Sequence, residues 1–116
     1  MSIFVFGSNL AGIHGAGAAL YARKHHGAIY GQGIGLQGQS YAIPTKDARI
    51  ITLPIREITK YVNQFIDFAG RSPSMAFMVT RIGCGLAGYT DIQIAPLFKD
   101  ATENCVLPNE WEQYIN

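Results

Sequence analysis

The sequence contains few charged residues and almost no excess of either sign. Lys, Arg, Asp and Glu make up 15% of the 116 residues, and the formal net charge is +1. A chain that binds nucleic acid through the phosphate backbone usually carries a broad positive surface, which this composition does not indicate. The basic run at 23–26 is short and typical of a solvated helix end. The hydrophobic content of 48% excludes a disordered chain and predicts one folded domain over residues 1–116.

Cysteine is also scarce. Cys84 and Cys105 follow no spacing that is typical of a metal site, so no metal and no cofactor are expected. No apolar run is long enough to span a bilayer, and no signal peptide is recognisable. These absences favour reduced thiols, a cytoplasmic location and no membrane partner.

Glycine, in contrast, is abundant and clustered. The chain has 13 glycines, above the usual share of roughly 7%, and they concentrate at 7–38 and 83–88. The second cluster follows the apolar run 75–79 and places three glycines in six residues. Because glycine lets backbone N–H groups approach an anion closely, this loop predicts a phosphate or pyrophosphate site. The alternative is a tight turn that binds nothing.

Strands and helices are expected to alternate along the chain. The expected strands are buried apolar runs, at 3–6, 40–43, 75–82 and 105–107, with 50–53 either a brief edge strand or part of a loop. The expected helices lie at 18–24, at 55–69 and between Asp91 and about Glu103, with a bend or a new start at Pro96. Gly7-Ser8-Asn9 and Pro44 are expected to end the first two strands, and 28–39 to form an irregular loop. This alternation predicts a three-layer α/β/α fold with a mostly parallel sheet and helices on both faces.

Three loops follow three of these strands, at 7–17, 44–47 and 83–91. In a parallel sheet they open at the same edge, where open α/β sheets bind ligands. Asn9 either presents its amide to sugar hydroxyls or closes a turn. Lys46 offers a cation or, if desolvated, a nucleophile, the alternative being a solvated or paired side chain.

Other residues of these loops also have two interpretations. Cys84 is a nucleophile or, with no histidine near in sequence, a small buried residue. Thr90 or Asp91 caps the helix that follows. Tyr89 stacks on a sugar or base, or packs in the core.

Three motifs in this order resemble the macrodomain family. Ile3–Ala19 combines an apolar strand, an Asn-bearing turn and a glycine loop that opens a helix. The run 82–88 is similar to the macrodomain loop that holds the phosphates of ADP-ribose. The segment 41–46 resembles the Thr-Lys segment of the DarG and terminal ADP-ribose glycohydrolase branch, and the whole chain is similar to small phage and bacterial proteins.

The resemblance implies a site for an ADP-ribose-like nucleotide. It implies a catalytic role for Lys46, as in removal of ADP-ribose from glutamate side chains or DNA bases, and Asp47 or Asp91 is expected to serve as acid or base. The expected ligand-binding residues lie in the three loops: Ser8, Asn9, Gly15, Ala16, Gly17, Thr45, Gly83, Cys84, Gly85, Leu86, Ala87, Gly88 and Tyr89. The pattern departs from the family at both ends of the site. It is truncated at the N-terminus, lacking the opening strands whose aspartate holds adenine, and it has Ala87 or Thr90 where the branch has a third-loop aspartate.

The sequence therefore leaves three functions open. The chain binds ADP-ribose or a related NAD-derived nucleotide and hydrolyses ADP-ribosyl linkages with Lys46, or it binds such a nucleotide without chemistry, or it is a protein-interaction domain without a functional pocket. Nucleic acid is expected only as an ADP-ribosylated substrate. A homo-oligomer that completes the sheet or the cleft is a further expectation.

Overall fold

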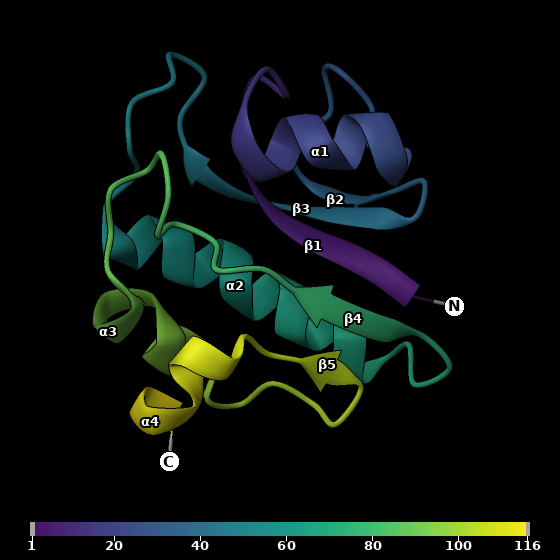
Figure 1. Ribbon diagram of the computed structural model, residues 1–116, viewed down its shortest axis with the longest axis vertical. Helices are drawn as coiled ribbons and strands as arrows, with labels where there is room; N and C mark the ends of the chain where they lie inside the picture. The colour runs from purple at the N-terminus through teal and green to yellow at the C-terminus, as the bar shows by residue number, and fades with distance from the viewer. Residues whose placement is uncertain (1, 116) are drawn as a thin grey trace.

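The computed structural model describes residues 2–115 and contains a mixed five-stranded sheet with helices (Figure 1). The strands run in the spatial order β2-β3-β1-β4-β5. Their bounds are Ser2–Asn9 for β1, Gly35–Gln37 for β2, Ser40–Lys46 for β3, Ala76–Val79 for β4 and Cys105–Val106 for β5. Strands β1, β3, β4 and β5 are parallel, and β2 pairs antiparallel with β3. The expected mostly parallel α/β sheet is therefore confirmed.

Helices lie against both faces of this sheet. The helical elements are α1 Gly17–His25, α2 Ile55–Gly70, α3 Asp91–Ile94, the 3-10 turns η1 Ala95–Phe98 and η2 Asn109–Trp111, and α4 Glu112–Ile115. Successive residues of β1 point to opposite faces, as the pleat requires. Val5 belongs to the larger core with α2, whereas Phe6 packs with Ala19 and Ala22 of α1. The predicted stripe of α2 is buried at Ile58, Val62, Phe65 and Ala69.

Two predicted strand ends are wrong. Gly7 and Ser8 do not end β1, because the strand continues through them to Asn9 and all three residues pair with β3, with a register shift between Ser8 and Asn9. Pro44 does not end β3 either. The antiparallel partner β2 reaches only as far as Ala42, so β3 has a free edge at Pro44, where a proline is tolerated.

The glycine-rich segment 28–39 is more ordered than the sequence indicates, because it contains β2. The side chain of Gln37 holds it: Oε1 accepts from the Ile29 N–H at 2.8 Å, and Nε2 donates to the Gln32 carbonyl at 3.1 Å. His14 Nε2 also contacts the Gln32 carbonyl, at 3.1 Å. A buried amide thus supplies the organisation that apolar periodicity does not reveal.

The β4 region is less buried, and its following helix shorter, than predicted. Only Phe77 and Val79 of β4 are buried, whereas Met78 is exposed on the other face. The helix expected to reach about Glu103 consists of the single turn α3 followed by η1, with Pro96 at the start of η1. Pro96 is the second residue of η1, and proline is tolerated in the first turn of a helix because its missing N–H needs no partner there.

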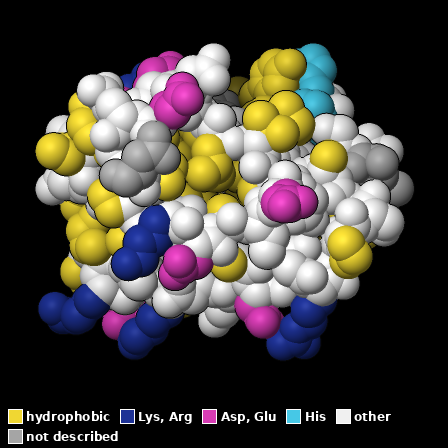
Figure 2. Space-filling view, turned by 90° about the horizontal axis from the view of Figure 1, so that it is seen from below, with side chains coloured by type: hydrophobic (Ala, Val, Ile, Leu, Met, Phe, Trp, Pro, Cys, Tyr) yellow, Lys and Arg dark blue, Asp and Glu magenta, His cyan; other side chains and the backbone are white. Residues whose placement is uncertain are grey.

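The surface carries no broad region of one charge in the view of Figure 2. Histidines lie beside hydrophobic side chains at one edge, and Lys and Arg alternate with Asp and Glu along the opposite edge (Figure 2). His26 stacks on Phe4 with ring centroids 4.5 Å apart, and Tyr21 packs on His25 at 4.6 Å. Within residues 2–115, no helix is both long enough and apolar enough to cross a membrane.

Candidate functional site

A cleft of about 590 Å³ opens at the carboxyl edge of the parallel strands. Its lining comes from three segments, which are 7–19 with gaps, 45–50 with gaps and 80–87. In Figure 1 these loops lie together on the side of the sheet away from the N-terminus. The volume falls within the range of small-molecule sites. The predicted convergence of the three loops on one cleft is confirmed.

The first wall of the cleft is the N-terminus of α1. Ala16 precedes the helix in an extended conformation and no side chain caps it, and the first turn contains no acidic residue. The first intrahelical bond described runs from the Leu20 N–H to the Ala16 carbonyl. Because the opening N–H groups of a helix have no intrahelical acceptor, this end carries a partial positive charge next to the cleft. The predicted residues Gly15, Ala16 and Gly17 all line the cleft.

The second wall is the loop 83–87, whose glycines have different reasons to be there. Gly83 has φ +75°, and a Cβ would lie 3.0 Å from Ile94 Cδ1, so the turn itself requires glycine. Gly85 has no positive φ, and a Cβ there would have no neighbour within 4 Å. Neither backbone geometry nor packing requires glycine at 85, which leaves its backbone open to a ligand.

The neutral polar side chains of the cleft are already hydrogen-bonded to the chain. Asn9 Oδ1 accepts from the Ile13 N–H at 2.9 Å, and its Nδ2 donates to the Ile13 carbonyl at 2.8 Å. The Ser8 hydroxyl donates to the Gly33 carbonyl, and the Thr45 hydroxyl to the Ser8 carbonyl. Asn9 therefore closes a turn, as its alternative interpretation held, and is not free to orient a ribose with both ends of its amide.

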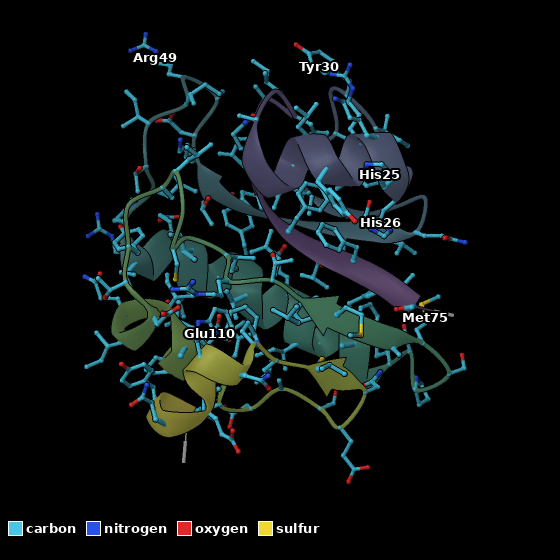
Figure 3. All side chains as sticks on the ribbon, in the orientation of Figure 1. His25, His26, Tyr30, Arg49, Met75 and Glu110 are labelled. Atoms are coloured by element: carbon cyan, nitrogen blue, oxygen red, sulfur yellow. The ribbon has the colours of Figure 1, made fainter. Side chains whose placement is uncertain are left out.

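Two cations line the cleft. Lys46 has no ion-pair partner among residues 2–115. Arg81, which sequence reasoning missed, donates from Nε and Nη2 to the two oxygens of Asp91 at 3.0 and 2.6 Å. Its Nη1 also lies 3.9 Å from Glu110 (labelled in Figure 3). Arg81 lies in the chain between the end of β4 and Gly83. This position after a strand is the signal that could have identified it as a cleft residue.

Asp91 does not line the cleft, contrary to the role expected for it as acid or base. Its carboxylate also accepts from Trp111 Nε1 at 2.8 Å. Hydrogen bonds from Arg81, together with the bond from Trp111, lower the pKa of Asp91 to about 2. A carboxyl with this pKa is a poor proton donor at neutral pH. The geometry thus makes Asp91 the link between the third loop and the C-terminal segment.

Gly88 and Tyr89 also lie outside the lining of the cleft. The Tyr89 hydroxyl donates to the Leu53 carbonyl at 2.6 Å, and its ring packs against the larger core. Tyr89 therefore anchors the loop after β4 to the segment before α2. This agrees with the packing alternative and not with a ring stacked on a ligand.

Cys84 lines the cleft but is unsuited to nucleophilic attack. Burial raises the pKa of its thiol to about 12, and the nearby Asp91 carboxylate acts in the same direction. Since the thiolate is the reactive form, Cys84 is unreactive at neutral pH. Its alternative interpretation as a small, partly buried residue fits the structure.

The loop after Lys46 contains a strained residue. Ile50 has φ +66°, a conformation that β-branched residues rarely adopt, and its side chain lines the cleft. The Asp47 carboxylate holds the loop by accepting from the N–H groups of Arg49 and Ile51 at 2.8 and 3.0 Å. Arg49 lies at the outer tip and points away from the molecule (Figure 3). Backbone strain of this kind is concentrated at functional sites.

The resemblance to macrodomains depends on three short motifs, and parts of all three line this one cleft. Comparison of the chain with protein-family models, with curated proteins and with solved structures finds no match.

Proposed function

We propose that the cleft binds ADP-ribose or a related NAD-derived nucleotide. One observation carries the proposal: two backbone segments, 15–19 at the start of α1 and the glycine loop 83–87, line a single cleft together with Lys46 and Arg81. Among the described residues that line the cleft, none is acidic. Helix N-termini, open glycine loops and cations all favour phosphate groups. The macrodomain-like motifs support ADP-ribose within this class, and with it a macrodomain arrangement of the sheet and helices.

The geometry favours binding without chemistry. Hydrolysis of an ADP-ribosyl linkage needs a group that activates water or protonates the leaving group. Asp91 lies outside the cleft in contact with Arg81 and Trp111, and the Asp47 carboxylate holds its own loop. No described lining residue therefore supplies a carboxylate.

Hydrolysis with Lys46 is the second candidate. The ammonium group has no ion-pair partner among the described residues and belongs to a side chain that lines the cleft. As a cation it would stabilise the negative charge on the leaving glutamate carboxylate or base. In its deprotonated form the amine would attack the anomeric carbon, breaking the ADP-ribosyl bond and releasing that group. This candidate requires an acid–base group from the substrate or from bound water.

Calorimetry with ADP-ribose tests the proposal. The wild type should bind one equivalent, and Lys46→Met should bind about 10- to 100-fold more weakly, because a charge-assisted hydrogen bond contributes roughly 1.5–3 kcal/mol. Lys60→Met is the control, since Lys60 pairs with Glu57 on α2, away from the cleft. The proposal fails if the wild type gives no heat at millimolar ADP-ribose.

A release assay separates the two candidates. The wild type and Lys46→Met are incubated with ADP-ribosylated protein and with ADP-ribosylated single-stranded DNA, and free ADP-ribose is measured. Binding without chemistry predicts no release by either form. Release by the wild type that Lys46→Met abolishes would establish the hydrolase instead.

A further inference from the structure

We infer that the cleft does not discriminate between nucleobases and recognises a nucleoside diphosphate through its phosphates and through apolar contact. This inference rests on the proposed function, since it specifies which nucleotides the same cleft accepts. The lining of the cleft is taken from residues 2–115, the part of the chain that the structure describes.

Selecting one base requires directional donors or acceptors, because the bases differ in the hydrogen-bonding pattern of their edges. Four neutral polar side chains line the cleft: Ser8, Asn9, Thr45 and Thr80. Each is bonded to a backbone group, Thr80 through its hydroxyl to the Val5 carbonyl at 2.7 Å. The first three are buried, so breaking their bonds would leave unpaired polar groups inside the fold.

No other side chain of the described lining can read a base edge. The lining contains no Asp, Glu, Gln, Tyr or Trp. Lys46 and Arg81 are its charged members. The guanidinium of Arg81 donates through Nε and Nη2 to Asp91, so this pair of donors is not free to read the edge of a guanine. The Lys46 ammonium sits on a flexible stem and imposes no fixed direction, and it matches phosphate oxygens, which are the same in every nucleotide. Affinity from these two side chains therefore depends on the phosphates and not on the base.

The remaining contact surface is apolar and has no directional preference. Ile13, Ile50 and Leu86 are the exposed large hydrophobic side chains of the cleft. Leu86 is 70% exposed, and its Cδ1 lies 3.5 Å from the position that a Cβ on Gly17 would occupy. It thus reaches from the third loop to the start of α1. Aliphatic side chains pack against the flat face of any base, since every base has one.

The test is a calorimetric series with ADP, GDP, CDP and UDP, together with adenosine. We expect the four diphosphates to bind with Kd values within about threefold of one another, and adenosine not to bind at millimolar concentration. Leu86→Ser should weaken all four diphosphates by a common factor of about three to ten. Ile51→Ser is the matched control, because Ile51 is 59% exposed but does not line the cleft.

The outcomes separate this inference from the proposal beneath it. A preference of tenfold or more for one base, or a Leu86→Ser effect confined to one base, would overturn the inference and leave nucleotide binding standing. It would mean that backbone groups of the loops read base edges. If none of the diphosphates and no ADP-ribose binds, the proposed function itself fails.

Discussion

Replacing Ile50 by glycine tests whether the fold maintains strain at the cleft. A non-glycine residue in the left-handed region costs about 1–2 kcal/mol relative to the right-handed one, and Ile50 has φ +66°. Glycine carries no such cost, but its own entropy in the unfolded chain opposes the gain. The experiment therefore needs a reference variant in which glycine also replaces isoleucine, so that the unfolded-chain entropy changes equally, at a residue without a positive φ.

Ile51→Gly is that reference, since Ile50 is the one non-glycine residue with positive φ within 2–115. The exposed fractions of Ile50 and Ile51 are 41% and 59%, so their buried fractions differ by about a fifth of a side chain. At about 1.5–3 kcal/mol for full burial, this difference is worth about 0.5 kcal/mol. After this correction, Ile51→Gly should lower the free energy of unfolding by about 1 kcal/mol more than Ile50→Gly does.

Urea unfolding followed by the fluorescence of the buried Trp111 measures both variants. A difference of about 1 kcal/mol corresponds to roughly 4–8 °C in Tm for a chain near this size. If Ile50→Gly lowers stability as much as Ile51→Gly, or more, the strain argument is wrong. Because the Ile50 side chain lines the cleft, Ile50→Gly should also weaken nucleotide binding, and Ile51→Gly should not.

Three further predictions follow from the contacts around the cleft. Hydrogen bonds from Arg81 and Trp111 lower the pKa of Asp91 to about 2. The stability from these contacts is therefore fully present above about pH 4 and is lost as the pH falls through 2. Urea unfolding between pH 5 and pH 2 should show a smaller loss of unfolding free energy for Asp91→Asn than for the wild type. Burial raises the pKa of Cys84 to about 12, so iodoacetamide at pH 7.5 should label Cys84 in the folded protein far more slowly than in urea; equal rates by mass spectrometry would contradict this. A Cβ on Gly33 would lie 2.1 Å from the Asn9 carbonyl oxygen, so Gly33→Ala should lower the free energy of unfolding by about 2–3 kcal/mol. Gly85→Ala is the control and should cost less, because Gly85 has no positive φ and a Cβ there has no neighbour within 4 Å.

The position of the cleft could be predicted from the sequence because it depends on local patterns. Apolar runs alternate with helical periodicity, and parallel strands bring the loops that follow them to one edge. The loops after β1, β3 and β4 met there as this rule requires. Gly15, Gly17 and Gly85 belong to these loops, and their backbone lines the cleft.

The roles of individual side chains could not be predicted, because they depend on partners distant in the chain. Asp91 meets Trp111 twenty residues later and Arg81 ten residues earlier, and no periodicity encodes these meetings. Pro44 continues its strand only because β2 stops short of it. The Asn9 amide bonds to the backbone N–H and carbonyl of Ile13. The sequence alone does not distinguish this closed turn from one that leaves the amide free.

The expected partner subunit and the ADP-ribose ligand stay predictions, and the ligand is open to a direct measurement. Titration of isotopically labelled protein with ADP-ribose, followed by backbone N–H chemical shifts, locates binding residue by residue. We expect saturable shifts concentrated at 15–19 and 83–87, the two backbone walls of the cleft. Absence of shifts, or shifts centred instead on the depression formed by 69–73 and 100–104, would contradict it.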